Sequence, residues 1–193
     1  MPRRIALWID VAVKAALIGL LLLAVLRPDL PQFEGKAMTG RALTYPIAAL
    51  VVPLAWWLYG RKRSDRYPYA LDILLTLPFL IDVAGNALDL YDSIDWWDDA
   101  NHFVNWGLLT AAFGQLLVRL PVGRLAAVGL MIGFGATTAV LWEFAEYFTF
   151  IRDSPEEATA YEDTLGDLAL GLTGSVVAAL ITARLWPLLR SPG

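Results

Sequence analysis

The chain of 193 residues contains no cysteine and one histidine, and only 18% of its residues are charged. Without cysteine there are no disulfides and no thiolate metal ligands, and the redox compartment is left open. The formal net charge is −4, and this lack of basic excess argues against a nucleic-acid partner.

Long apolar runs dominate what is present. Hydrophobic residues make up 58% of the chain, and the mean hydropathy is +0.54. Charges are sparse within the apolar runs and cluster between them. A membrane-spanning helix needs roughly 20 mostly apolar residues, so this pattern predicts an all-α, polytopic transmembrane bundle.

Six segments are each long enough to cross a bilayer as a helix. The predicted spans are about 5–26, 42–60, 69–91, 99–120, 123–149 and 164–188. The first run follows Arg3 and Arg4, as in a signal peptide, but it exceeds an h-region of roughly 7–15 residues. We therefore expect an uncleaved first span and a single integral membrane domain over residues 1–193.

Lysine and arginine set the predicted orientation, because cytoplasmic loops are enriched in both. With about six spans, one face collects Arg3, Arg4, Arg61, Lys62, Arg63, Arg66, Arg119, Arg124, Arg184 and Arg190. The other face collects Arg27, Lys36, Arg41 and Arg152. The first face, with both termini, is predicted to be cytoplasmic.

Most acidic residues fall on the opposite, outer face. The first group is Asp98-Asp99-Ala-Asn-His102-Phe103, at the start of the fourth predicted span. Asp98 could cap the helix N-terminus, where a carboxylate also suits the macrodipole. His102 lies one turn further in, on the face shared with Asp98 and Asp99, which favours a ligand or proton-transfer role.

Glu143 and Glu146 form the second group, near the end of the fifth predicted span. Carboxylates at a helix C-terminus oppose the macrodipole. Apolar residues continue to Ile151, so Glu143 is expected below the membrane rim. Two like charges there repel each other unless they share a proton or a cation.

Asp163 and Asp167 form the third group, at the start of the last span. Asp163 is a plausible N-cap, whereas Asp167 lies one turn deeper, where capping is no longer available. Small residues on the same helix, Gly171 and Gly174, predict close helix packing, and Gly129 and Gly133 of the fifth span form a small-xxx-small pattern.

Two further polar sets lie in the first and third spans. Asp10 and Lys14 are four residues apart and opposite in charge, which predicts mutual neutralisation inside the bundle. Asp82, Asn86 and Asp89 form one polar stripe. Asp82 is near the middle of its span, so it should face the bundle interior or a water-filled cavity.

The three acidic groups resemble those of the YjdF-like bacterial inner-membrane proteins, a family of uncharacterised function, and are more distantly similar to VanZ-like membrane proteins. The family pattern is Asp-Lys-x-x-His-Phe, Trp-Glu-x-x-Glu and Asp-Thr-x-x-Asp. Here it reads Asp98-Asp99-Ala-Asn-His102-Phe103, Trp142-Glu143-Phe-Ala-Glu146 and Asp163-Thr164-Leu-Gly-Asp167, within residues 70–180. Asp99 replaces the family's lysine. The resemblance implies a six-span, multi-pass protein of the bacterial-type inner membrane and no established reaction.

Carboxylates with one imidazole suit Mg²⁺, Mn²⁺, Ca²⁺ or Zn²⁺. The leading hypothesis is an outward-facing divalent-metal site that hydrolyses or transfers a lipid or lipid-linked substrate. Glu143, Glu146 and His102 are the candidate catalytic residues. The candidate metal ligands are Asp98, Asp99, His102, Glu143, Glu146, Asp163 and Asp167.

Two alternatives stay open. An ion or proton transporter would use the same acids, with Asp82, Asn86 and Asp89 as the path inward. A structural or assembly protein would use its acidic outer face to dock a basic partner. The residues leave the substrate and the oligomeric state undetermined.

Overall fold

The computed structural model describes residues 2–63 and 66–190, and the described residues form helices and turns with no strand among them. The chain divides into two compact units, Met1–Ile94 and Asp95–Gly193. We call them unit 1 and unit 2 and describe each by itself.

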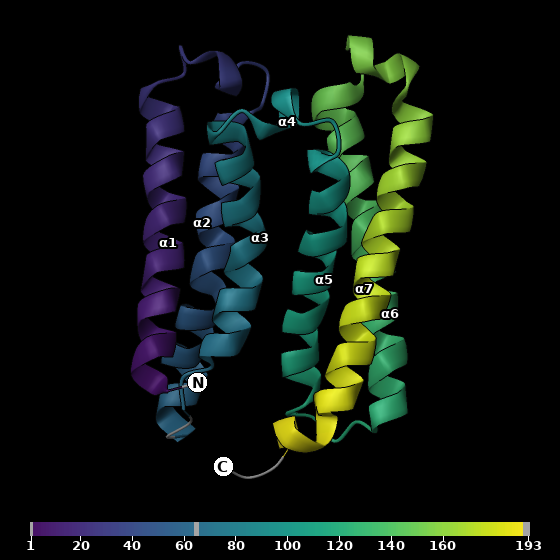
Figure 1. Ribbon diagram of the computed structural model, residues 1–193. Coiled ribbons are helices and arrows are strands. Elements are labelled where there is room, and N and C mark those ends of the chain that lie inside the picture. Colours follow the sequence, from purple (N-terminus) through teal and green to yellow (C-terminus); the bar gives the residue numbers. More distant parts are fainter. Residues whose placement is uncertain (1, 64–65, 191–193) are drawn as a thin grey trace. The chain divides into compact units, whose positions relative to one another are not determined.

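Three long helices build unit 1 (Figure 1). They are α1 (Arg3–Leu26), α2 (Met38–Ala55) and α3 (Tyr69–Ala87). A π-helical turn, η2 (Trp56–Gly60), and a short 3-10 turn, η3 (Arg61–Arg63), extend α2, while η1 (Pro31–Phe33) lies in the α1–α2 connection and α4 (Leu90–Ser93) follows α3. These bounds lie close to the first three predicted spans, because runs of apolar residues near 20 in length specify such helices strongly.

The core of unit 1 is formed where α1, α2 and α3 meet. Leu17 and Leu21 of α1, Tyr45 and Ala49 of α2, and Val83 of α3 are all buried in one cluster. The Tyr45 ring also packs against Phe79, with ring centroids 4.8 Å apart. Tyr45 brings its hydroxyl into this apolar contact, and that hydroxyl needs a polar partner, which α3 supplies.

Unit 2 also contains three long helices, α5 (Trp97–Leu117), α6 (Arg124–Glu146) and α7 (Ala160–Arg190). A π-helical turn, η4 (Tyr147–Ile151), extends α6, and η5 (Pro155–Ala158) precedes α7. Their alternating directions bring the start of α5, the end of α6 and the start of α7 to the same end of unit 2 (Figure 1). All three acidic sequence groups therefore lie at that end.

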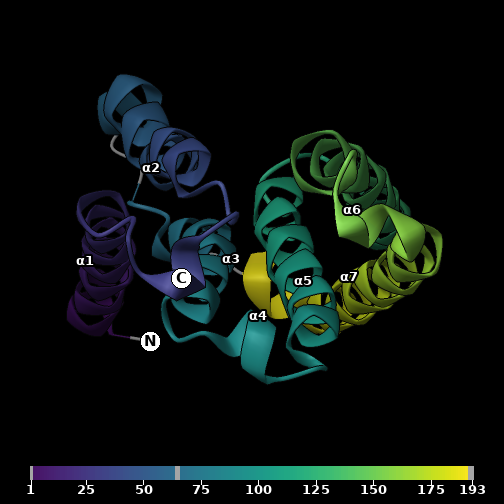
Figure 2. The same ribbon diagram turned by 90° about the horizontal axis from the view of Figure 1, so that it is seen from above.

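Small residues on α7 allow the helices of unit 2 to approach closely. A Cβ at Gly174 would overlap the backbone carbonyl of Phe103, and a Cβ at Gly171 would lie 2.6 Å from the Trp106 ring. Seen along the helices, α7 lies beside both α5 and α6 (Figure 2). The predicted role of Gly171 and Gly174 in close packing is confirmed.

The packing glycine of α6 is not one that the sequence pattern indicated. Gly129 and Gly133 have no atom within 4 Å of an added Cβ, whereas a Cβ at Gly135 would overlap the Ser175 side chain. Ser175 in turn accepts a hydrogen bond of 3.0 Å from Thr110. The small-xxx-small pattern thus identified the right helix but the wrong face of it.

The outer surfaces of both units are apolar along the helices. Leu43, Leu125 and Leu188 are 71%, 86% and 73% exposed. A soluble protein rarely exposes so much contiguous apolar surface, whereas lipid-facing helices require it. Within the described part of the chain, five helices are long and apolar enough to cross a membrane: Arg3–Leu26, Met38–Gly60, Tyr69–Ala87, Arg124–Thr149 and Ala160–Arg190. The described α5, which matches the fourth predicted span, is not among them, so the count of six spans stays a prediction.

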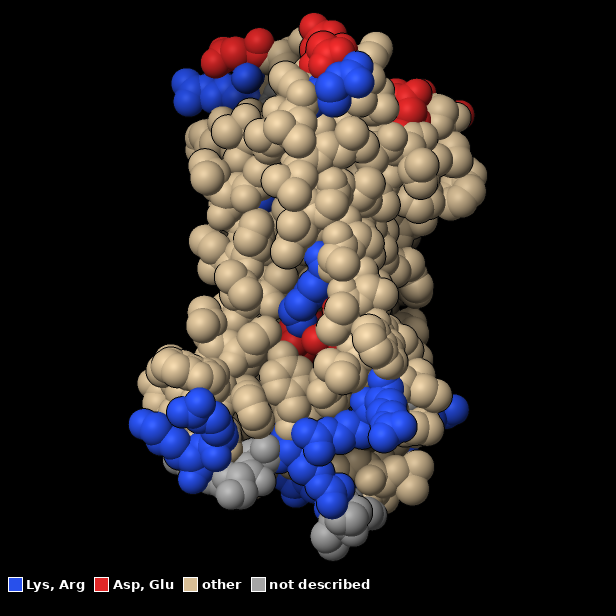
Figure 3. Space-filling view, turned by 90° about the vertical axis from the view of Figure 1, so that its left-hand side faces the viewer, with Lys and Arg blue, Asp and Glu red and all other residues tan. Residues whose placement is uncertain are grey.

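Basic side chains gather at one end of unit 1. Arg3, Arg4, Arg61, Lys62 and Arg66 are exposed there, around the start of α1 and the segment between α2 and α3. On the face drawn in Figure 3, Lys and Arg predominate toward that end and Asp and Glu toward the opposite one. The asymmetry fits the predicted orientation, which stays a prediction.

Candidate functional site

His102 is the centre of the polar cluster in unit 2. Its Nδ1 atom contacts the Asp167 carboxylate, and its Nε2 atom lies 4.0 Å from Oε2 of Glu146. The contact between His102 and Asp167 lies where α5 approaches α7 closely. The backbone carbonyl of Phe103, the residue after His102, packs on Gly174, which lies two turns beyond Asp167 on α7. Both contacts belong to the same interface between α5 and α7.

Five predicted ligands come within metal-binding reach of one another. One group is Asp98, His102 and Asp167, and the other is His102, Glu143 and Glu146; within each group the ligand atoms lie within 4.8 Å of one another. His102 belongs to both groups. The structure therefore brings together all three acidic motifs around one imidazole, as the order of the motifs on successive helices indicated.

The cluster is buried yet poorly satisfied. His102 and Glu143 are each 6% exposed and Asp167 is 4% exposed, while Asp98 and Glu146 are half-buried. Among the described residues, Oε1 of Glu143 is buried with no hydrogen-bond partner. A buried carboxylate oxygen without a donor carries its full desolvation cost. The position of this atom is the clearest sign that the cluster lacks a positive charge.

Among the described residues, only His102 contributes a basic side chain to the cluster. None of the ion pairs formed by the described residues joins Asp98, Glu143, Glu146 or Asp167 to a lysine or an arginine. Four carboxylates around one imidazole cannot all stay ionised in an apolar setting. A bound cation or shared protons must therefore balance them.

Two predicted ligands lie outside this cluster. Asp99 and Asp163 are exposed, and neither joins the ligand groups found among the described residues. Both are in the first turn of their helices, where a carboxylate suits the macrodipole. Because α7 begins at Ala160, Asp163 lies inside its first turn and not at the N-cap, so the predicted N-cap role of Asp163 is wrong. Asp98 likewise follows the N-cap of α5, Trp96, and does not cap that helix.

Sequence reasoning missed Thr164 as part of the site. Its side chain lies beside the Glu143 carboxylate, one turn before Asp167. Thr164 stands between the two aspartates of the third motif, and its position next to an acidic pair was the available signal. Its role depends on the packing of α7 against α6, which the sequence does not reveal.

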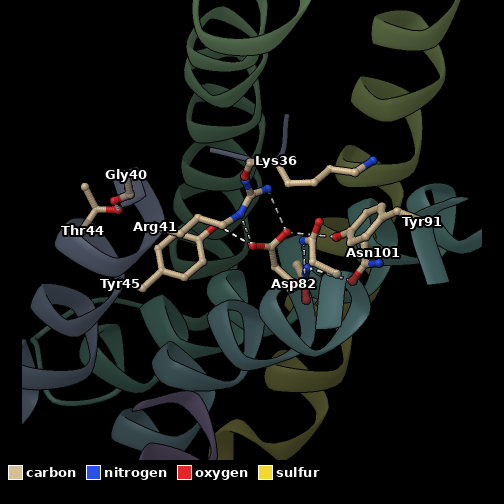
Figure 4. Close-up of polar contacts among 10 residues, drawn as sticks. Lys36, Gly40, Arg41, Thr44, Tyr45, Asp82, Tyr91 and Asn101 are labelled. Atoms are coloured by element: carbon tan, nitrogen blue, oxygen red, sulfur yellow. Dashed lines mark hydrogen bonds and ion pairs between the residues drawn. The ribbon is translucent and has the colours of Figure 1, made fainter. Parts of the chain in front are cut away.

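The stripe proposed as an ion path contains an ion pair in unit 1. Arg41 donates to Asp82 through Nε at 2.8 Å and Nη2 at 3.3 Å, and the hydroxyls of Tyr45 and Tyr91 donate to the same carboxylate at 2.7 and 3.0 Å (Figure 4). Asn86 donates to the backbone carbonyl of Asp82. Helix α3 ends at Ala87, and the exposed Asp89 follows it in left-handed backbone with φ 58°, so the prediction that Asp89 continues the stripe on the same helix is wrong. Asp82 is thus neutralised and fully hydrogen-bonded.

A second buried group in unit 1 surrounds Lys14. Its ammonium donates to Asp10 at 2.6 Å and to Asp72 at 2.5 Å, so the predicted pairing of Asp10 with Lys14 is confirmed and gains a second carboxylate. The Tyr67 hydroxyl also donates to Asp72. Burial, together with the neighbouring Asp72 carboxylate, raises the pKa of Tyr67 well above its usual range, so the phenol stays a donor.

Comparison with known proteins supports the membrane location that the apolar helices indicate. Residues 9–186 match the family described as "Predicted membrane protein (DUF2238)". A Thermotoga maritima protein that is named only as uncharacterized is 33% identical over 138 residues, which cover 66% of this chain and 69% of that protein. No solved structure matches the chain. These names do not include the YjdF-like or VanZ-like proteins, so that resemblance stays a prediction. The chain belongs to the DUF2238 family of predicted membrane proteins.

Proposed function

We propose that unit 2 holds a divalent metal ion at the His102 cluster and uses it to hydrolyse or transfer a lipid or lipid-linked substrate. One observation carries the proposal: one buried imidazole is surrounded by four carboxylates within ligand reach, with no lysine or arginine paired to them among the described residues. A divalent cation balances such a donor set with the least desolvation cost, and nitrogen with oxygen donors suits Mg²⁺, Mn²⁺, Ca²⁺ or Zn²⁺.

The two edges of His102 suggest separate roles for the carboxylates. A metal-bound histidine commonly has a carboxylate behind its other ring nitrogen, which fixes the tautomer and the ring orientation. Asp167 contacts Nδ1, so we assign Asp167 this orienting role. The Nε2 edge, on the side of Glu146, would then provide the metal ligand together with Glu143 and Glu146.

The accessible edge of the cluster suits a substrate in the lipid phase. The Glu146 side chain is 24% exposed, compared with 8% for His102 and 5% for Asp167. Phe144 of α6 and Phe148 of η4 are 59% and 68% exposed, on the opposite side of this helical segment from Glu146. An ester or phosphate group at the membrane surface would reach the cluster at the partly exposed Glu146 side chain. A bound metal would polarise that group and activate water, and a free carboxylate of the cluster would accept the proton.

Metal analysis of the full-length protein in detergent tests the first part of the proposal. We would strip the protein with a chelator and reload it with Mg²⁺, Mn²⁺, Ca²⁺ or Zn²⁺ singly. About one ion per chain is expected. His102→Ala and Glu143→Gln should weaken binding by at least about ten-fold, as even indirect partners of a metal site do. The control variant, Asp99→Asn, removes an exposed acid of the same motif and should bind as the wild type does. No stoichiometric metal in the wild type would refute the site.

A turnover assay tests the second part. Metal-loaded protein in vesicles that contain phospholipids and a polyprenyl phosphate should release free acyl chains, headgroup or phosphate. Glu146→Gln should abolish this release in protein that still folds. If the metal-loaded wild type turns over none of these lipids, the centre binds metal without the proposed chemistry.

A further inference from the structure

The buried acids around Lys14 do not balance in charge. Asp72 is completely buried and Asp10 is 6% exposed, and both contact the single ammonium of Lys14. No other ion pair formed by the described residues reaches either aspartate. Two carboxylates and one ammonium leave one negative charge, and burying an uncompensated charge is very costly.

One carboxylate oxygen of the cluster, Oδ1 of Asp72, has no hydrogen-bond donor among the described residues to balance its charge. Both Lys14 and Tyr67 donate to Oδ2 of Asp72, whereas Oδ1 is buried and has no hydrogen-bond partner among the described residues. Thr76, one turn further along α3, donates to the backbone carbonyl of Asp72 and so does not serve Oδ1. An unpartnered, fully buried carboxylate oxygen therefore faces a cluster with one excess negative charge.

We propose that the Asp10–Lys14–Asp72 cluster is a proton-binding site in unit 1, separate from the centre in unit 2. One proton is shared by the two carboxylates, and the cluster is then electrically neutral. A proton fits better than a metal ion, because Lys14 already fills the space between the carboxylates and leaves few oxygen donors for a cation that takes six or more ligands. In a membrane helix such an ionisable group is functional by default.

The surroundings of the cluster contain few other groups that titrate. Helix α1 contributes Asp10 and Lys14, and α3 contributes Asp72. The segment before α3 contributes Tyr67, which packs against Tyr69 and against the Trp56 ring of η2. The site lies roughly 10 Å along α1 from Arg3, at 1.5 Å per residue, and so close to the basic end of unit 1.

Infrared spectroscopy of the full-length protein in lipid nanodiscs tests the proposal, because a protonated carboxyl has a C=O stretch apart from carboxylate bands. At neutral pH the wild type should show a carboxylic band that is about one carboxyl stronger than in Asp72→Asn or Asp10→Asn. Either substitution leaves one aspartate with one lysine, so the cluster no longer needs a proton. The carboxyls of unit 2 contribute equally to all these spectra and cancel in the differences.

Three further measurements keep the test decisive. Lys14→Met leaves two acids without a cation, and the band should grow by about one carboxyl; this variant also serves if the aspartate variants do not fold. Asp82→Asn, in the hydrogen-bonded pair with Arg41, is the matched control and should leave the band unchanged. Raising Na⁺ at fixed pH should have no effect. Identical carboxylic bands in the wild type and Asp72→Asn, or loss of the band with Na⁺, would overturn the proposal.

Discussion

The two units treat their buried acids in opposite ways. In unit 1 the buried aspartates, Asp10, Asp72 and Asp82, each contact Lys14 or Arg41. In unit 2 the described ion pairs of Glu146 and Asp167 are made with His102 alone. A permanent cation of its own, as Arg41 provides for Asp82, makes an acid part of the architecture, whereas Lys14 is shared by Asp10 and Asp72 and balances only one of their charges. Acids that lack such a cation altogether depend on a ligand from outside, which is why the acids of unit 2 are the better candidates for a binding site.

The largest effect that tests this comparison is expected from Arg41→Met. It leaves Asp82 buried without its cation, and breaking a buried pair from one side costs about 3–5 kcal/mol. Thermal or SDS-induced unfolding in detergent would measure the loss. In Arg41→Met/Asp82→Leu no charge stays behind, so most of the stability should return. Equal losses in the single and double variants would show that packing, and not charge, is responsible.

The next effect concerns the glycine that positions the site of unit 2. Gly174→Ala should destabilise the protein by about 1–3 kcal/mol, because the new methyl group overlaps the Phe103 backbone and no rotamer change relieves it. Metal binding should weaken with it, since α5 moves away from α7. Gly133→Ala is the matched control, with open space at its Cβ. Unchanged unfolding of Gly174→Ala would contradict the close packing.

The third substitution is expected to raise the stability of the protein, unlike the first two. Glu143→Gln removes one of the unbalanced charges in unit 2, so the metal-free protein should become more stable by about 0.5–2 kcal/mol, as is common when a functional site is relieved of strain. Added divalent metal should stabilise the wild type and have little effect on this variant. If Glu143→Gln were less stable than the wild type, the acids of unit 2 would stabilise the fold, as Asp82 does in unit 1, and the prediction would be contradicted.

The smallest effect is expected from Tyr67→Phe in unit 1. It removes one donor to Asp72 and should cost about 0.5–1.5 kcal/mol, with the apolar packing of the ring kept. The raised pKa of Tyr67 sets the pH dependence. A group whose pKa is higher in the folded state contributes its full stability below its unfolded pKa, about 10, and loses it only as the pH rises further. The cost should therefore be constant from pH 6 to 9, and a strong pH dependence in that range would contradict it.

The helices of both units could be predicted from the sequence. Long apolar runs predicted α1, α2, α3, α6 and α7 to within a few residues, because a segment of about 20 apolar residues has few alternatives to a helix. The meeting of the acidic motifs at one end could be predicted for a related reason. Carboxylates one helical turn apart share a face, and successive helices run in alternating directions, so the motifs had to meet at one end.

The contact partners of individual side chains could not be predicted in this way. Nothing in the spacing of residues indicates that Arg41 reaches Asp82, or that Lys14 reaches Asp72 as well as Asp10. These contacts join different helices and depend on how each helix is rotated about its axis. The same rotation explains why Gly135 packs and Gly133 does not: the two lie two residues apart, on different sides of one helix.

By itself, the sequence determined that this is a helical membrane protein whose acidic motifs gather around one histidine, because hydropathy and helical periodicity are local properties of the chain. Only the tertiary structure decided which acids are neutralised. Asp82 is held by Arg41, Asp10 and Asp72 share Lys14, and the carboxylates around His102 have no lysine or arginine paired to them among the described residues. The physical reason is that neutralisation acts over a few ångströms across helices, and the packing of glycines and side chains sets those distances.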